Sequence, residues 1–421
     1  MSRPGRVAAL PTVALAVPVL HAHGGVTAVA RFLHRAIEES GRYRATLVSL
    51  ASSSRDRAST RLARPATWPR GVRALAETWE GHPVTHVGAA IVELETQRYR
   101  PRRLLTDLFD AHDVVQVVAG APAWANVARD TRTPVALQVA TLVGVERAER
   151  LARERGPRRV WRAAMTRAGA RIEHAALAHV DAAFVENRWM LEELRRRMPP
   201  ERVHFAPPGV DADTFTPAAV LARDGPILSV GRFGDPRKDL PTLFRAYARL
   251  RETLPDAPPL LLAGREGPRD VDRAVARDLG IADHVDIRTD LSFADLVAAF
   301  RSARLFVMSS REEGLGVAIL EAMACGLPVV STNSGGPSTT VADGETGFLT
   351  PVGDPDALAV RMRDLVLDPP RAAAMGAAGR RRVEHAFSLA VAGARFLDTY
   401  DALLAERPTR AEMRAARAAA R

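Results

Sequence analysis

Two carboxylates stand eight positions apart around a glycine-rich turn in the C-terminal half of the chain. Glu313 precedes Gly314-Leu315-Gly316, and Glu321 lies in the short helix that this turn is expected to open, Val317 to Cys325. A glycine turn at a helix start presents backbone N–H groups that bind anions or hydroxyls. Eight helical residues rise about 12 Å, which suits two glutamates holding opposite ends of one ligand. Spacing alone leaves open a capped helix with two solvent-facing glutamates.

A single lysine, Lys238, stands among the 59 basic residues of the chain. Together with Arg232 it follows an apolar run, 227–230, that is expected to be a buried strand ending in a turn. Open α/β sheets bind ligands at the carboxyl ends of such strands. A compact ammonium suits a diphosphate as a point charge, and a guanidinium adds a planar fork. The pair therefore indicates an anion site, with an accidental lysine on a solvated loop as the alternative.

The segment 227–351 closely resembles the nucleotide-sugar domain of the retaining glycosyltransferases of family GT4, which have the GT-B fold. The motifs that carry the resemblance are Val230-Gly231-Arg232 with Lys238, Leu262-Ala263-Gly264, Glu313 to Pro328 including Glu321, Ser334-Gly335-Gly336, Asp343 to Phe348, and Pro351. Upstream, Pro208-Gly209-Val210-Asp211 with Phe215-Thr216-Pro217 resembles the family's hinge. The N-terminal half is similar only through Gly24-Gly25-Val26 and its rhythm of strands and helices.

This resemblance implies a nucleotide-sugar donor and gives roles to particular residues. Glu313, Arg232 and Lys238 are expected to be catalytic. The residues expected to bind the donor are Gly25, Arg232, Lys238, Glu313, Gly314, Leu315, Gly316 and Glu321. Arg232 and Lys238 would neutralise the leaving diphosphate in place of a cation, so neither a metal site nor a cofactor is expected. Glu313 is expected beside the donor sugar, and Glu321 on the ribose hydroxyls.

The chain departs from the family pattern in two places. Family members often have a histidine just after the strand expected at 135–139, beside the sugar, whereas this chain has Gln138-Val139-Ala140-Thr141. Three histidines are candidates to replace it, and each is otherwise an ordinary loop histidine: His21, His23 and His112. Family members also have an acidic residue after the glycine pair that corresponds to Gly335-Gly336, and this chain has Thr339 at that position.

The expected fold class is α/β, the GT-B arrangement of two Rossmann-like domains that face each other across a cleft. A chain of 421 residues is long enough for two buried cores. The expected parts are an N-terminal acceptor-binding domain at 1–205, a linker at 206–224, a nucleotide-sugar domain at 225–386, and a helix with a basic tail at 387–421 that returns to the first domain. The one cysteine, Cys325, excludes an internal disulfide and a cysteine-based zinc cluster.

Short apolar runs alternate with helical periods throughout the chain, as in parallel sheets covered on both faces. Strands are expected at Thr12–Val17, Ala45–Leu50, Val114–Val118, Val135–Val139, Ala182–Val185, 227–230, 260–263, 284–287, 305–308 and 329–332. A helix is expected over Val26–Ser40, another from Phe387 to about Glu406, and a loop over 51–75. This order predicts two consecutive α/β units.

Positive charge is concentrated in the N-terminal half of the chain. Residues 1–210 hold 32 Lys+Arg against 20 Asp+Glu, and residues 211–421 hold 27 against 29. Arginines punctuate a helix expected near 153–171 that also carries Val160 and Trp161. Such a helix suits an anionic membrane surface or is a solvated arginine-rich face. An anionic or lipid-linked acceptor is compatible with it, and the 5% aromatic content argues against a nucleic-acid partner.

The N-terminal apolar run from Val7 to Leu20 imitates a secretory signal peptide. Pro11 and Pro18 interrupt it, and Gly24-Gly25-Val26 follows at once. In family GT4, which the chain resembles, this glycine turn directly follows the first strand. Cleavage of a signal peptide here would therefore remove a central strand of the fold. No other apolar segment reaches the length of a membrane span. The chain is therefore expected to be cytoplasmic, with peripheral contact at the inner membrane face left open.

The expected activity is transfer of a hexose from a UDP- or GDP-linked donor to an acceptor hydroxyl, with retention of anomeric configuration and without a metal ion. The alternatives are another nucleotide-sugar enzyme of the same fold, such as an epimerase, and a donor-binding pseudo-enzyme. A pyridoxal-dependent phosphorylase is disfavoured because the single lysine lies in the expected diphosphate loop. The hypothesis of a Rossmann oxidoreductase has less support still, since no Gly-x-Gly-x-x-Gly motif joins a predicted strand to a helix.

Overall fold

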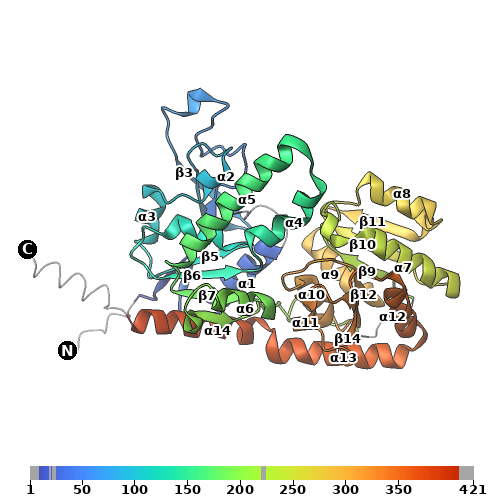
Figure 1. The fold of residues 1–421 in the computed structure, drawn as a ribbon. Coiled ribbons are helices and arrows are strands. Elements are labelled where there is room, and N and C mark those ends of the chain that lie inside the picture. The colour runs from blue at the N-terminus through green and yellow to red at the C-terminus, as the bar shows by residue number, and fades with distance from the viewer. Residues whose placement is uncertain (1–8, 19, 21–24, 220–223, 407–421) are drawn as a thin grey trace, which may run out of the picture.

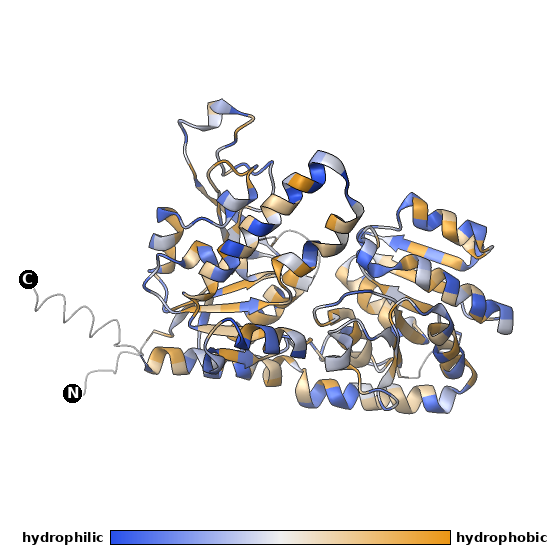
Figure 2. Cartoon of the chain, in the orientation of Figure 1, coloured by the Kyte–Doolittle hydropathy of each residue, from blue (hydrophilic) through white to orange (hydrophobic). Residues whose placement is uncertain are grey.

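The structure is a computed structural model that describes residues 9–18, 20, 25–219 and 224–406. Two sheets, each covered by helices on both faces, form two lobes joined by a short linker (Figure 1). Figure 2 shows hydrophobic residues concentrated along the strands and mixed colours on the covering helices. The GT-B arrangement of two Rossmann-like domains, predicted from the sequence, is confirmed.

The first sheet has eight strands within the described residues, in the order β3-β4-β2-β1-β5-β6-β7-β8. Their bounds are β1 Thr12–Val17, β2 Arg44–Leu50, β3 Ala74–Trp79, β4 His82–Val87, β5 Val114–Ala119, β6 Val135–Val139, β7 Ala182–Val185 and β8 Val203–Phe205. β1 pairs in parallel with β2 on one side and β5 on the other. β3 is antiparallel to β4 and forms one edge.

The second sheet has six strands among the described residues, in the order β11-β10-β9-β12-β13-β14, and every pair is parallel. Their bounds are β9 Ile227–Val230, β10 Leu260–Gly264, β11 Val285–Thr289, β12 Leu305–Met308, β13 Val329–Thr332 and β14 Gly347–Thr350. Strands buried on both faces read as continuous apolar runs, which is why β9, β12 and β13 were predictable.

The helices cover both faces of each sheet. In the first lobe they are α1 Gly25–Glu39, α2 Glu95–Arg98, α3 Arg103–Phe109, α4 Val143–Arg153, α5 Gly156–Leu177 and α6 Arg188–Arg195. In the rest of the chain they are α7 Leu240–Thr253, α8 Asp270–Asp278, α9 Phe293–Ser302, α10 Val317–Ala324, α11 Pro337–Thr340, α12 Pro355–Leu367, α13 Pro369–Ala386 and α14 Leu389–Ala405. Alternation along β1 places Val13 and Leu15 against α1 and α14, and Ala14 and Ala16 in the core of the opposite face.

The helix α14 lies against the first lobe, although it follows the second lobe in sequence (Figure 1). Phe396 and Tyr400 are fully buried in the core that contains β1 and α1. The Tyr400 hydroxyl donates to Oε1 of Gln116 on β5 at 2.7 Å, which satisfies both polar groups inside the core. The last helix therefore ties the two lobes together.

The strands predicted from apolar runs are present, and their ends differ by at most two residues. Four strands were missed: β3, β4, β8 and β14. β3 carries alternating exposed residues, and β4 begins with two exposed residues, so neither has the continuous apolar run of a central parallel strand. β8 and β14 have three and four residues and are edge strands. Their short apolar runs give little periodic signal.

The loop predicted at 51–75 holds a three-residue 3₁₀ turn, Pro65–Thr67, and gives way to β3 at Ala74. Cys325 is free and 3% exposed, which agrees with a small core residue at the end of α10. Among the described residues, no helix combines the length and apolar character needed to cross a membrane.

Candidate active site

A cavity of about 590 Å³ lies between the two lobes, at the carboxyl edges of both sheets. Its walls include residues that directly follow β5, β6 and β7 of the first sheet and β9, β10 and β11 of the second. These residues are Gly120, Ala140, Glu186, Gly231, Arg265 and Asp290. Carboxyl edges of parallel sheets are the usual ligand sites of open α/β folds. The topology therefore brings the chemistry-bearing loops of both lobes to one place.

The glycine turn predicted from the sequence forms one wall of this cavity, with Gly314, Leu315 and Gly316 among its lining residues. Gly316 has φ of 78° and precedes α10, a left-handed conformation that favours glycine. A Cβ on Gly336 would lie 2.4 Å from the Gly314 carbonyl oxygen, so the loop that contains Gly336 packs its backbone directly against the backbone of the glycine turn. The turn thus directs the start of α10 toward the cavity, where the helix dipole favours anionic groups.

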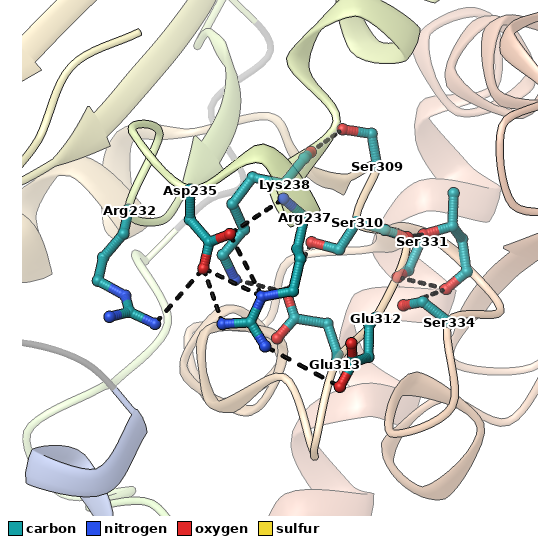
Figure 3. A network of polar contacts seen from close by, with 11 residues as sticks. Arg232, Asp235, Arg237, Lys238, Ser309, Ser310, Glu312, Glu313, Ser331 and Ser334 are labelled. Carbon is teal, nitrogen blue, oxygen red and sulfur yellow. Dashed lines mark hydrogen bonds and ion pairs between the residues drawn. The ribbon is translucent and has the colours of Figure 1, made fainter. Parts of the chain in front are cut away.

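Lys238 and Glu313, which lie 75 positions apart in sequence, meet in this wall (Figure 3). The Lys238 Nζ donates to Glu313 Oε1 at 2.5 Å, and the Ser310 hydroxyl donates to the same oxygen at 2.6 Å. Their side chains are 19% and 13% exposed, so the pair is largely shielded from water. The ammonium that was predicted to face a diphosphate is thus hydrogen-bonded to the carboxylate that was predicted to face the sugar.

Arg232 lines the same cavity from the loop after β9. Its side chain is 48% exposed, and its guanidinium lies 3.7 Å from the Asp235 carboxylate. Asp235 is held more closely by Arg237, at 2.8 Å, and Arg237 also lies 3.9 Å from Glu312 (Figure 3). Arg232 is therefore the more loosely held cation of the loop and is the freer to turn toward an anion.

Glu321 lies on α10 and lines the cavity, as does Arg31 on α1 of the first lobe. Burial raises the pKa of the Glu321 carboxyl to about 7, while the positive charge of Arg31 acts in the opposite direction. The Arg31 guanidinium is held by Glu80 at 2.9 Å and lies over the ring of Phe293 in the second lobe. Glu321 is thus a carboxyl whose charge changes near neutral pH.

The first lobe contributes the N-terminus of α1 and a hydrogen bond across the cleft. Gly25, predicted to bind the donor, is the first residue of α1 and lines the cavity, so a helix N-terminus faces it from this side also. The Asn187 amide donates to the Gly314 carbonyl at 2.8 Å and to the Ala140 carbonyl at 3.3 Å. It therefore joins the two lobes at the glycine turn.

Sequence reasoning missed Gln138 and Glu186 in the cavity wall and Asn187 beside the glycine turn. Glu186 and Asn187 directly follow the apolar strand β7, and Asn187 caps α6 by accepting from the Met190 amide. A polar residue placed immediately after a predicted parallel strand is a readable signal, because such strand ends line the cleft. Gln138 lies inside β6 and carries no comparable signal.

The histidine candidates do not fill the position expected for an imidazole. His112 lies before β5, at the amino end of that strand and thus at the edge opposite the cavity, and its Nδ1 is 2.8 Å from the Leu108 carbonyl. That candidate is therefore wrong, because the sheet places it on the far side. His21 and His23 lie outside the described residues, as does Gly24. Thr339 is buried on α11 and is not part of the cavity wall.

A second cavity of about 990 Å³ adjoins the first and shares Gly25, Gly120 and Arg232 with it. Its remaining walls come mostly from the first lobe and combine aromatic with charged side chains. They include Tyr99, Trp124, Trp161, Arg147 and Arg162. Arg147 pairs with Glu95, and Arg162 donates to Glu154 at 2.6 Å. Among the described residues, no group of three or more His, Cys, Asp or Glu is placed to hold a metal ion.

Two Rossmann-like lobes share a cavity at the carboxyl edges of their sheets, which is the arrangement of the GT-B fold. The segment 220–382 matches the family model described as glycosyl transferases group 1. This match covers the C-terminal lobe, and the resemblance of that lobe to family GT4, predicted from the sequence, is confirmed.

One similar protein is a GDP-mannose-dependent alpha-(1-6)-phosphatidylinositol monomannoside mannosyltransferase from Mycolicibacterium smegmatis. It is 38% identical over 198 residues, which are 43% of this chain and 52% of that protein. The matched region thus spans about half the length of this relative.

Solved structures are similar over nearly the whole chain. Sucrose-phosphate synthase from Thermosynechococcus elongatus has a TM-score of 0.72 at 22% identity and covers 94% of this chain and 100% of its own. HepE from Anabaena in complex with UDP-glucose has a TM-score of 0.67 at 14% identity, and the match covers 93% of this chain and 99% of HepE. At these identities the likeness establishes the fold.

Proposed function

We propose that this protein transfers a hexose from a UDP- or GDP-linked donor to an acceptor hydroxyl, with retention of anomeric configuration and without a metal ion. The observation that carries the proposal is the wall of the 590 Å³ cavity, where Arg232, Lys238 and two helix N-termini surround one space. Positive charge and backbone N–H groups converging on one site suit a diphosphate. The names of the similar proteins, one GDP-mannose-dependent and one bound to UDP-glucose, support a nucleotide sugar as the ligand.

In this proposal the bound diphosphate replaces Glu313 as the partner of the Lys238 ammonium. Arg232 and Lys238 then neutralise the charge that develops on the leaving nucleoside diphosphate, which stabilises the transition state. The amides of Gly314, Leu315 and Gly316 bind phosphate oxygens and sugar hydroxyls. The acceptor hydroxyl attacks from the face that the leaving group vacates, so the anomeric configuration is retained.

The decisive experiment is a panel of nucleotide sugars, including UDP-glucose and GDP-mannose, incubated with the purified full-length chain. Release of UDP or GDP, alone or with an acceptor, supports a transferase, and NMR of the glycoside reports the anomeric configuration. A sugar altered at one carbon but still linked to its nucleotide would support the epimerase alternative. Binding without turnover of any donor would support a pseudo-enzyme. A strict requirement for an added divalent cation would contradict the metal-free mechanism.

The pH dependence of nucleotide affinity is expected to depend on Glu321. An ionised carboxylate accepts two ribose O–H bonds, and a neutral carboxyl accepts only one strongly. Because burial raises the pKa of Glu321 to about 7, lowering the pH below that value should protonate this carboxyl and weaken the binding of UDP or GDP. Glu321→Gln should weaken binding at high pH by about 1.5–3 kcal/mol and by less at low pH. Calorimetric titration at several pH values measures both effects.

The nucleotide phosphates also titrate, so the informative quantity is the difference between the wild-type protein and Glu321→Gln at each pH. Glu252→Gln is the matched control, because Glu252 is an exposed glutamate on α7 in the same lobe and is not part of the cavity wall. If the difference in nucleotide affinity between the wild-type protein and Glu321→Gln stays constant with pH, the assignment of Glu321 to the ribose is contradicted.

The proposed acceptor is anionic and lipid-linked, and it enters from the 990 Å³ cavity. The similar mannosyltransferase is named for a phosphatidylinositol monomannoside, an acceptor of this chemistry. Close to the second cavity, α5 exposes Val160 by 71% and Trp161 by 60%, next to the exposed Arg158 and Arg159. Apolar and basic side chains together on one helix suit the surface of an anionic membrane. The proposal thus places the enzyme in the cytoplasm, in peripheral contact with the inner membrane face.

Co-sedimentation with vesicles tests this contact. We expect binding to vesicles that contain phosphatidylglycerol and little binding to pure phosphatidylcholine, since each arginine near an anionic surface contributes about 1 kcal/mol. Trp161→Ser should reduce sedimentation several-fold. Trp68→Ser is the control, because Trp68 is similarly exposed, at 52%, on the loop before β3. Equal sedimentation of all three proteins would rule out α5 as the membrane contact.

A further inference from the structure

Glu186 is a buried carboxyl in the cavity wall that none of the roles described above uses. It directly follows β7 in the first lobe, is 5% exposed and lines the 590 Å³ cavity. A Cβ on Gly314 would lie 2.2 Å from Glu186 Oε1 and 2.9 Å from the Ala140 Cβ. The carboxyl therefore lies directly against the glycine turn of the opposite lobe, beside the small side chain of Ala140.

Gln138 accompanies Glu186 in this corner of the cavity. Its side chain is 2% exposed, lines the same cavity, and its Nε2 is 3.4 Å from Glu186 Oε2. The Gln138 Oε1 is buried without a hydrogen-bond partner among the described residues. A buried polar atom without a partner costs free energy, and such atoms call for a ligand group. The amide oxygen is thus available to a donor that enters the cavity.

Burial keeps the Glu186 carboxyl largely neutral at pH 7. The pKa of Glu186 is raised to about 8, chiefly by desolvation and also by the negative charge of Glu313, while the contact with Gln138 acts in the opposite direction. Glu313 faces Glu186 from the glycine turn, and Lys238 in turn pairs with Glu313. A neutral acid beside an amide offers hydrogen-bond donors and acceptors without net charge. Such a pair suits hydroxyl groups better than phosphate or a cation.

We propose that Glu186 and Gln138 form the site that binds hydroxyl groups of the transferred sugar. The neighbouring residue after β6 is Ala140, so no histidine side chain lies at that position. This inference rests on the proposed function, in which the sugar lies beside Glu313. The proximity of Glu186 to both Glu313 and Gly314 places the pair at the sugar end of the cavity. The two residues therefore determine which sugar is accepted, while Lys238 and Arg232 hold the diphosphate.

The test compares wild-type protein with Glu186→Gln, Glu186→Ala and Gln138→Leu. Donor turnover is measured with UDP-glucose and GDP-mannose, and affinity for UDP and GDP by calorimetry. We expect Glu186→Ala and Gln138→Leu to lower kcat/KM for the preferred donor by about tenfold or more. Nucleotide affinity should change less than about twofold, which also shows that the variants are folded. Glu201→Gln, an exposed glutamate of the same lobe, should match the wild type.

A pH profile separates sugar binding from mere packing. Wild-type kcat/KM should fall as the pH rises through about 8, because ionised Glu186 no longer donates a hydrogen bond. Glu186→Gln has a permanent donor, so this decline should disappear. A decline retained in Glu186→Gln, or a loss of UDP and GDP affinity equal to the loss of turnover, would overturn the inference alone. Failure of the wild-type protein to bind either nucleotide would overturn the proposed function and this inference together.

Discussion

Replacing Lys238 by alanine is expected to cause a large loss of nucleotide affinity. The ammonium is largely shielded and hydrogen-bonded to Glu313 at 2.5 Å, so it is held in place before a ligand arrives. A hydrogen bond that involves a charged group contributes about 1.5–3 kcal/mol. Affinity for UDP or GDP should therefore fall by about 10- to 150-fold. Turnover should fall further, because the same charge stabilises the leaving diphosphate.

The matched control is Arg245→Ala, which removes one positive charge from an exposed position on α7 outside the cavity wall. Calorimetric titration with both nucleotides measures the effect, and a thermal unfolding curve shows whether each variant is folded. If Lys238→Ala and Arg245→Ala bind nucleotide equally well, general electrostatic attraction would explain the binding. The diphosphate would then lie elsewhere than beside Lys238.

Glu313→Ala is expected to separate turnover from nucleotide binding. The carboxylate accepts hydrogen bonds from Lys238 and Ser310, and the proposal places it beside the sugar. Removing it should lower kcat by on the order of a hundredfold, the effect of losing one preorganised polar group at a reacting centre. Affinity for UDP or GDP should stay equal or rise, because Lys238 no longer has a competing partner.

Steady-state kinetics with the preferred donor and calorimetry with the free nucleotide give the two quantities. Glu252→Ala, which removes an exposed carboxylate of α7, is the control for a change of charge. Equal losses of turnover and of nucleotide affinity in Glu313→Ala would contradict its place at the sugar. Such a result would favour a role in holding the glycine turn.

The central strands and the glycine turn were predictable because their causes are local in the sequence. Continuous apolar runs such as those of β1 and β12 mark strands buried on both faces, and Gly316 with a left-handed backbone marks the start of α10. Three of the four missed strands, β3, β8 and β14, lie at sheet edges, and β4 pairs with the edge strand β3. For these strands, pairing with a neighbour decides the conformation more than the local pattern does.

Arg232, Lys238, Glu313 and Glu321 of the second-lobe cavity wall were also predictable, because they match a family pattern. The pairing of Lys238 with Glu313 was not, since it joins residues 75 positions apart. The contribution of the first lobe was less predictable still. Asn187 reaches Gly314 across 127 positions, and Glu186 meets the same glycine.

The amino-acid sequence by itself determined the order of strands and helices, the glycine-rich helix starts and the set of cations available for a diphosphate. These follow from hydrophobic periodicity and from the conformational freedom of glycine, which act between near neighbours. Only the tertiary structure decided which side chains meet in the cleft and which carboxyl groups there have raised pKa values. Packing two lobes together removes water from Glu186 and Glu321, and desolvation of that kind depends on distant parts of the chain.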